Sequence, residues 1–143
     1  MTPEEIARAS AERMWELDAV SAAQGMELMS VDPGDARVTM RVLPTMLNAH
    51  KMCHGGHIFT LADTAFAYAC NSYGVSTVAQ HCSITYLAPA RLDDLLTAHA
   101  REVQVAGRTG VYDVSIANQN GLAIAEFRGL SRAVPKAPIG GAP

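Results

Sequence analysis

One short stretch of the chain concentrates the residues that could do chemistry. Asn48, His54, Gly55 and Gly56 lead into an apolar segment that carries Asp63. Two glycines at the start of a helix leave the backbone uncovered, and the first amides of a helix lie unpaired at its positive dipole end. Such amides suit a carbonyl oxygen that becomes negatively charged during nucleophilic attack. The alternative is a tight turn that leads into a packed helix.

Asp63 is the second candidate for chemistry. At helical spacing its neighbours are Phe59, Phe66, Ala67 and Cys70. An ionised carboxylate among apolar side chains costs free energy unless a partner pairs with it. Asp63 is therefore either a carboxylate that accepts backbone hydrogen bonds from an adjacent strand, or a general base or nucleophile whose pKa is raised by burial. The sequence leaves both interpretations open.

The spacing of Gly55 and Asp63 limits how they could act together. They are eight residues apart, which is roughly 12 Å along a helix. One subunit cannot easily bring both groups to the same carbonyl. Two antiparallel helices from different subunits could pair the Gly55 end of one with Asp63 of the other. If Asp63 is catalytic, we expect the active site at a dimer interface.

The other polar residues near the glycines allow more than one role. His54 could hydrogen-bond a substrate or satisfy the loop backbone, and Asn48 could line a site or shape a turn. His50, Cys53, His54 and His57 raise a metal site, but no His-Glu-x-x-His helix or C-x-x-C pair is present. We therefore expect no metal. The sequence also has no serine-hydrolase elbow, phosphate loop or dinucleotide fingerprint.

The overall composition narrows the possible partners. The chain has 143 residues and a net charge of -3, and its eleven basic residues are scattered, which argues against nucleic acid and a membrane surface. No apolar stretch reaches membrane-spanning length, and the acidic N-terminus is unlike a signal peptide. Three cysteines without C-x-x-C spacing favour a reducing cytoplasm. The charged content of 17% is thin, which suggests that part of the surface is buried in an oligomer.

The order of the elements predicts one α+β domain over residues 1–133. Thr2 as an N-cap and Pro3 at the first helical position predict a helix over 3–18. The segment 56–72 is apolar nearly all round and predicts a helix in the middle of the fold. Alternation and turn residues predict strands at 26–31, 36–42, 77–88, 94–106, 109–118 and 122–132. An antiparallel sheet wrapped around a single central helix satisfies this order with short connections.

Turn and loop residues punctuate these elements. Residues 32–35 (DPGD) and 120–121 (Asn-Gly) predict tight turns, and residues 44–53 predict a loop. Residues 134–143 are rich in Pro, Gly and Ala and predict a poorly ordered tail. The strand at 36–42 is expected to be half-buried and to expose Arg37, Thr39 and Arg41.

The stretch 46–74 (MLNAHKMCHGGHIFTLADTAFAYACNSYG) resembles the PaaI-type thioesterases of phenylacetate degradation, members of the hot-dog superfamily. The similarity continues through 83–89 (SITYLAP), 107–113 (GRTGVYD) and 127–131 (FRGLS). It covers about residues 10–133. The resemblance implies a hot-dog fold, in which an antiparallel sheet wraps a long central helix beside a short N-terminal helix.

The resemblance also implies roles for the candidate residues. Asp63 would be the catalytic carboxylate, acting across a dimer on a thioester whose carbonyl the Gly55 amide of the other subunit polarises, with His54 and Asn48 lining the site. The family is metal-free and typically a homotetramer of two dimers. Its substrates are phenylacetyl-CoA and ring-hydroxylated relatives, so coenzyme A is part of the substrate and no cofactor is expected. Some relatives have a hydroxyl residue where this chain has Ala67, which leaves open whether Asp63 attacks directly or activates water.

Substrate contacts are expected around this centre. Gly56 adds a second amide at the helix start, and Phe66 is expected to shape the acyl pocket. Lys51, Arg108 and Thr109 lie near predicted loop ends, where they could contact the phosphates of coenzyme A or simply be solvated turn residues. Two other functions remain possible: a hot-dog hydratase or dehydratase, whose usual His-Phe-Pro-Gly loop is missing, and a non-catalytic acyl-CoA binding module.

Overall fold

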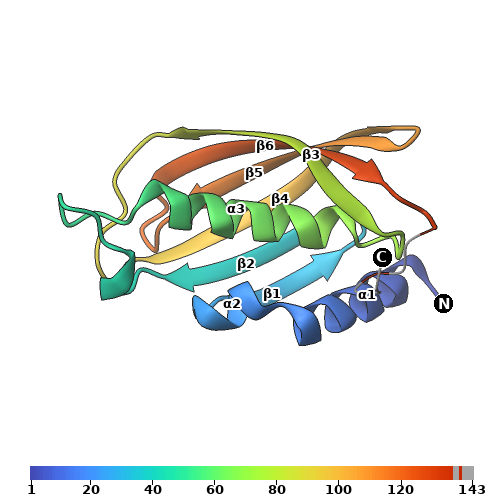
Figure 1. Cartoon of the computed structure of the whole chain (residues 1–143), viewed down its shortest axis with the longest axis horizontal. Helices are drawn as coiled ribbons and strands as arrows, with labels where there is room; N and C mark the ends of the chain where they lie inside the picture. Colours follow the sequence, from blue (N-terminus) through green and yellow to red (C-terminus); the bar gives the residue numbers. More distant parts are fainter. Residues whose placement is uncertain (137–138, 140–143) are drawn as a thin grey trace.

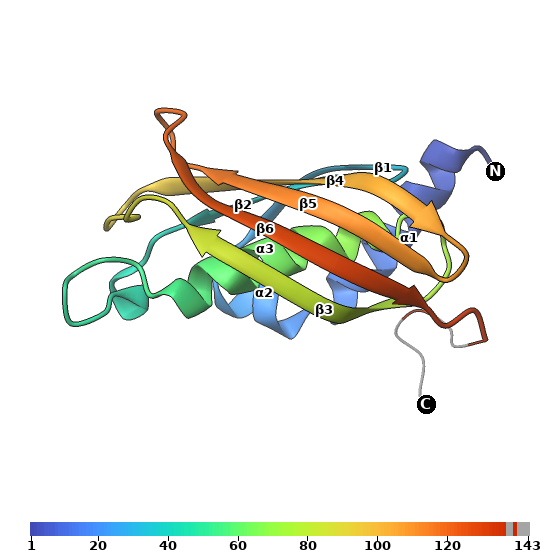
Figure 2. The same ribbon diagram turned by 90° about the horizontal axis from the view of Figure 1, so that it is seen from above.

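The computed structural model describes residues 1–136 and 139. Its one sheet is antiparallel, has six strands in the order β1-β2-β4-β5-β6-β3, and curves around a single long helix, α3 (Figures 1 and 2). This is the α+β arrangement predicted from the order of the elements. The elements are α1 (Pro3–Leu17), α2 (Ala19–Ala23), β1 (Glu27–Asp32), β2 (Asp35–Arg41), η1 (Pro44–Met46), α3 (Gly55–Cys70), β3 (Thr77–Tyr86), β4 (Leu95–Ala106), β5 (Thr109–Ala117) and β6 (Ala123–Ala133).

The N-terminal segment starts as predicted and then contains a second helix that was not predicted. The Thr2 hydroxyl accepts a hydrogen bond from the Glu5 amide (3.1 Å), which caps α1. Asp18 separates the two helices and caps α2, because its carboxylate accepts from both the amide (3.0 Å) and the hydroxyl (2.6 Å) of Ser21. A helix of only five residues is too short to show a periodic pattern of apolar residues in the sequence.

The predicted turns and strand faces are largely confirmed. Gly34 and Gly121 have positive φ angles of 72° and 78°, as tight turns at these positions require. The apolar face of β2 is buried. Thr39 departs from the expectation of a solvated outer face and is only 9% exposed. Its neighbours in register are Glu27 on β1 and Thr97 on β4, and they flank it on both sides.

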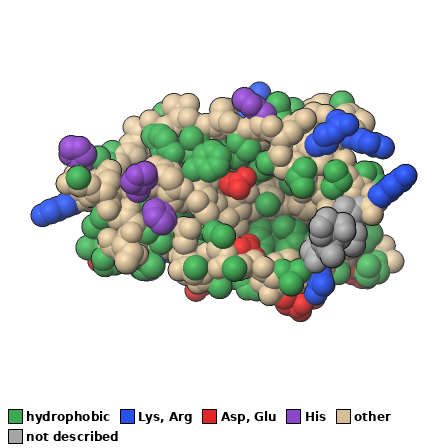
Figure 3. All heavy atoms as spheres, viewed as in Figure 1, with side chains coloured by type: hydrophobic (Ala, Val, Ile, Leu, Met, Phe, Trp, Pro, Cys, Tyr) green, Lys and Arg blue, Asp and Glu red, His purple; other side chains and the backbone are tan. Residues whose placement is uncertain are grey.

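One face of α3 is open, contrary to the expectation of a helix buried on every side. The sheet covers the apolar face of α3. Five of the α3 residues that remain at least partly accessible recur at intervals of three or four positions and therefore share one face, called here the open face: Gly56, Thr60, Asp63, Thr64 and Ala67. The space-filling view from this side shows hydrophobic side chains with acidic ones among them across its middle, and several Lys and Arg side chains at the right-hand end (Figure 3).

Strand β3 forms an edge of the sheet next to α3. It pairs only with β6, and most of its residues are exposed. The outer edge of β3 therefore carries backbone amides and carbonyls without a strand partner among the described residues. Together with the open face of α3, this edge is one side of the molecule that the described residues leave uncovered.

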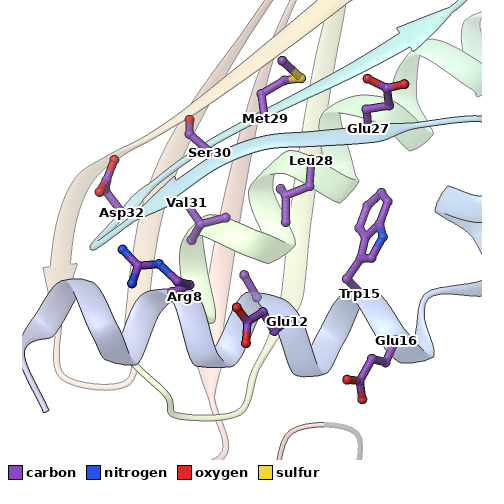
Figure 4. Close-up of a pocket in the computed structure, with 11 residues that line it drawn as sticks. Arg8, Glu12, Trp15, Glu16, Glu27, Leu28, Met29, Ser30, Val31 and Asp32 are labelled. Atoms are coloured by element: carbon purple, nitrogen blue, oxygen red, sulfur yellow. The ribbon is translucent and has the colours of Figure 1, made fainter.

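At the opposite edge of the sheet from β3, a groove lies between α1 and β1. Its volume is about 820 Å³. Trp15 of α1 and Leu28 and Val31 of β1 point toward one another across it (Figure 4). The groove contains neither Gly55 nor Asp63, so it plays no part in the candidate site. No helix among the described residues is long and apolar enough to cross a membrane.

The predicted C-terminal tail is only partly described. Residues 137, 138 and 140–143 lie outside the described residues. Val134, the first residue of the predicted tail, still donates a backbone hydrogen bond to the Ser76 carbonyl (2.7 Å). The folded domain therefore extends at least to this residue.

Phe66 is a core residue, although the sequence placed it among the substrate contacts. It is 1% exposed and packs edge-on against Tyr112, with ring centroids 5.6 Å apart. Gly129 on β6 makes room for it, because a Cβ added there would lie 2.8 Å from the Phe66 ring. Helical spacing placed Phe66 and Asp63 on one helix but did not show that Phe66 points into the sheet.

We predict that Gly129→Ala destabilises the fold by about 1–3 kcal/mol, because the added methyl overpacks the core against Phe66. Urea unfolding of wild type and variant checks this, with the midpoint expected to fall and the slope to stay the same. An unchanged midpoint would show that the Phe66 ring moves aside freely, and would return it to the candidates for substrate contact.

Candidate active site

The start of α3 presents one free amide. His54 is the N-cap, and its Nδ1 atom accepts a hydrogen bond from the Gly56 amide (3.1 Å). The Gly55 amide has no acceptor within the part of the chain that the structure describes. Of the two glycine amides that the sequence singled out, Gly55 is therefore the available donor, and Gly56 is already paired.

The loop before α3 is held by Asn48. Its Oδ1 atom accepts from the amides of His50 (2.9 Å) and Met52 (3.1 Å). Lys51, at the tip of this loop, has a positive φ of 59°. The Asn48 oxygen thus shapes the turn, which was one of the two roles considered, and its side-chain NH₂ group has no acceptor among the described residues.

Tyr86 is a contact of the site that the sequence analysis missed. Its hydroxyl donates to the Gly55 carbonyl (2.7 Å) across 31 residues of sequence. Its ring lies so close that a Cβ on Gly55 would be 2.9 Å from Cζ. A side chain at position 55 would therefore have to displace the Tyr86 ring, and glycine avoids this contact while leaving its amide accessible. Only the presence of a tyrosine within the SITYLAP segment hinted at this contact.

Asp63 is half-buried on the open face of α3. Among the described residues its carboxylate forms no ion pair and accepts no hydrogen bond. Burial raises its pKa above the ordinary value of 3.8. The pKa values of two nearby thiols, Cys70 and Cys82, are also raised, mainly by burial and in part by the negative charge of Asp63. The hydrogen bonds from an adjacent strand that a structural carboxylate would need are not found among the described residues.

One chain keeps its candidate groups apart. Gly55 and Asp63 lie on the same helix, roughly 12 Å apart along its axis. Lys51 precedes α3, whereas Arg108 and Thr109 lie at the β4–β5 hairpin, and Figures 1 and 2 place these two segments at opposite ends of the molecule. A single chain therefore does not bring all of these residues to one place.

The histidines and the cysteine that were considered as metal ligands do not gather into a metal site. The His57 Nδ1 atom lies 3.1 Å from the Gln24 Oε1 atom. Cys53 is buried, which raises the pKa of its thiol to about 11. Across the described residues, no cluster of three or more His, Cys, Asp or Glu side chains has a geometry that could hold a metal ion.

A shallow apolar pocket adjoins the Gly55 end of α3. Its volume is about 500 Å³, and it is called here the apolar pocket. It is lined by Met52, Cys53, Gly55, Ile58, Tyr86, Leu87, Ala88, Pro89 and Ala90. Such a pocket suits an apolar group held beside the free amide.

Comparison with known proteins identifies relatives of this chain. Residues 50–125 match the family model of the thioesterase superfamily. The chain is 49% identical over 125 residues to the acyl-coenzyme A thioesterase PaaI of Escherichia coli (strain K12), which covers 87% of this chain and 89% of the relative. The structure of the E. coli PaaI protein from the phenylacetic acid degradation operon aligns with a TM-score of 0.91 at 47% identity, covering 93% of this chain and 96% of that one. A hypothetical thioesterase of Streptococcus pneumoniae TIGR4, solved with coenzyme A, aligns with a TM-score of 0.80 at 32% identity, covering 86% and 96%.

Proposed function

The chain belongs to the thioesterase superfamily and has its hot-dog fold, and we propose that it hydrolyses acyl-CoA thioesters to the free acid and coenzyme A. The relative at 49% identity carries this activity in its name. Coenzyme A is part of the substrate in this proposal, and no metal or other cofactor takes part. We place the reaction in the cytoplasm, where acyl-CoA thioesters are made and used.

One observation of the site carries the proposal. Within the described residues, a helix N-terminal amide without an acceptor at Gly55 accompanies a half-buried carboxylate without a partner at Asp63. The amide donates to the thioester carbonyl and stabilises the oxyanion that forms on attack. Asp63 supplies the oxygen nucleophile directly, forming an anhydride that water then opens, or removes a proton from the attacking water. In both routes the carbon–sulfur bond breaks, and coenzyme A leaves as the thiolate and gains a proton.

The two groups meet across a dimer in this proposal. A two-fold axis would place two α3 helices antiparallel, with Gly55 of one subunit beside Asp63 of the other. The open face suits this contact, because its side chains are small and the hydroxyls of Thr60 and Thr64 bond to their own helix, at the carbonyls of Gly56 (2.9 Å) and Thr60 (2.7 Å). The unpaired edge of β3 would meet its own copy beside them. We propose a homotetramer built from two such dimers.

The substrates proposed are phenylacetyl-CoA and its ring-hydroxylated relatives. The similar E. coli structure comes from the phenylacetic acid degradation operon, and the apolar pocket beside Gly55 suits an aryl group. His54 and Asn48 line the same end of α3. Lys51 of one subunit and Arg108 and Thr109 of another are proposed to contact the phosphates of coenzyme A.

A panel of thioesters tests the reaction and the substrate class. Thiol release is followed with phenylacetyl-, hydroxyphenylacetyl-, benzoyl-, acetyl- and hexanoyl-CoA. We expect kcat/KM to be highest for the aryl-acetyl esters, by about tenfold or more over acetyl-CoA, because an apolar pocket gains about 1–3 kcal/mol from the larger group. Binding of the esters without hydrolysis of any would establish the acyl-CoA binding module instead.

A further inference from the structure

Tyr86 makes a defined contact with the backbone beside the free amide. It stands at the end of β3, the edge strand, and reaches across to the first turn of α3. Its hydroxyl donates to the Gly55 carbonyl at 2.7 Å, although the side chain is 49% exposed and water is available to it. Its ring occupies the space that a side chain on residue 55 would fill.

The first turn of α3 needs such support. Two successive glycines have the widest choice of backbone angles, and helix ends fray. The direction of the Gly55 amide depends on the backbone angles at this residue, and these also set the direction of its carbonyl. His54 holds the next amide, at Gly56, from the solvent side. The Gly55 carbonyl and the Gly56 N–H share one peptide plane, so Tyr86 and His54 hold this plane from its two edges. The Gly55 N–H belongs to the preceding plane, which is joined to the held plane at the Gly55 Cα, so holding the one limits the directions open to the other.

We propose that Tyr86 is a positioning residue, which acts through the Gly55 carbonyl to hold the Gly55 amide in the direction that the thioester oxygen requires. This inference rests on the proposed function. Burial raises the pKa of the Tyr86 hydroxyl, so the hydroxyl keeps its proton and remains a donor at neutral pH. Tyr86 also lines the apolar pocket, which links the orientation of the amide to the pocket proposed for the acyl group.

The test is Tyr86→Phe, which keeps the ring against Gly55 and removes only the hydroxyl. Loss of an entire oxyanion donor lowers kcat by about 10²–10³, and a misdirected donor keeps part of its effect. We expect kcat for phenylacetyl-CoA to fall by about tenfold, with KM and the urea unfolding midpoint unchanged. Tyr73→Phe is the matched control. Tyr73 is 45% exposed and donates to Glu102 at 2.8 Å, away from α3's N-terminus, and its variant should match wild type.

A second readout follows the amide itself. Selective ¹⁵N labelling of glycine gives signals from only eleven residues, and Gly55→Ala assigns the Gly55 signal. In Tyr86→Phe we expect the Gly55 signal to shift or broaden and its amide hydrogen to exchange faster, while Tyr73→Phe leaves it unchanged.

The outcomes separate this inference from the proposed function. A lower kcat together with an altered Gly55 signal supports the positioning role. An unaltered Gly55 signal overturns it, whatever happens to kcat, and so does a loss confined to KM or to stability. If wild type hydrolyses no thioester while Tyr86→Phe alters the Gly55 signal, the control of the amide stands and the thioesterase proposal fails.

Discussion

Asp63→Asn is expected to lower kcat/KM for phenylacetyl-CoA by more than about a hundredfold and to raise the free energy of unfolding at neutral pH. The amide of asparagine is neither a nucleophile nor a base, so the activity falls. The stability rises because burial disfavours the ionised carboxylate, and no hydrogen bond or ion pair within the described residues offsets this. Opposite effects on activity and stability are typical of a group kept for chemistry.

The raised pKa of Asp63 also predicts how the stability difference between Asp63→Asn and wild type changes with pH. The folded-state pKa of Asp63 is raised above 3.8, so in the window between the two values the folded chain binds a proton that the unfolded chain has lost. The destabilisation by Asp63 is absent below this window, grows as pH rises through it and is constant above it. The excess in free energy of unfolding of Asp63→Asn over wild type should therefore grow from about pH 4 upward. Urea unfolding at a series of pH values measures it.

Asp113→Asn is the matched control. The Arg128 guanidinium donates two hydrogen bonds to Asp113 (2.7 and 2.9 Å) and lowers the pKa of that carboxyl. Its contribution to stability is present at neutral pH and is lost as pH falls, so the asparagine variant should be slightly less stable and fully active. An Asp63→Asn variant that stays active, or that loses stability at neutral pH, would make Asp63 a structural carboxylate.

Local chemistry made much of the fold and site predictable. Alternating β2 residues, the DPGD and Asn-Gly turns and the Thr2 cap each encode their structure within a few residues, and these elements were found where predicted. Gly55 was singled out as a free helix-start amide, and the structure shows that it has no acceptor among the described residues.

The features that the sequence did not predict depend on contacts between segments that are far apart in the sequence, or on a surface that the described residues do not cover. Tyr86 reaches Gly55 only because β3 runs along the sheet edge beside α3, which no local pattern encodes. The apolar composition of α3 predicted a helix in the middle of the fold, yet no described residue of this chain covers its open face. Helical spacing also could not distinguish Phe66, which points into the sheet, from Asp63, which does not.

Gly55→Pro removes the free amide and also places a Cβ against the Tyr86 ring. Gly55 is the first residue of α3, where proline is tolerated, and His54 has the extended backbone (φ -61°, ψ 135°) that suits the residue before proline. We expect kcat to fall by about 10²–10³. Gly55→Ala places the same Cβ against Tyr86 but keeps the N–H, so it should retain much more activity. Equal losses in both variants would assign the effect to the ring of Tyr86 being pushed aside.

Mixing the two inactive variants tests whether the site lies between subunits. In a Gly55→Pro/Asp63→Asn heterodimer, one site combines both mutations and the other combines the native Gly55 of one subunit with the native Asp63 of its partner. Random reassociation makes half of the dimers mixed, and each has one intact site of two, so activity should return to about a quarter of that of wild type. The two variants, carrying different affinity tags, are refolded together from urea and assayed with phenylacetyl-CoA. A site within one chain would leave every combination inactive, because no subunit would then hold both native groups. Since Gly55 and Asp63 are held roughly 12 Å apart on one rigid helix, recovery is the outcome that the geometry of α3 requires of an active thioesterase.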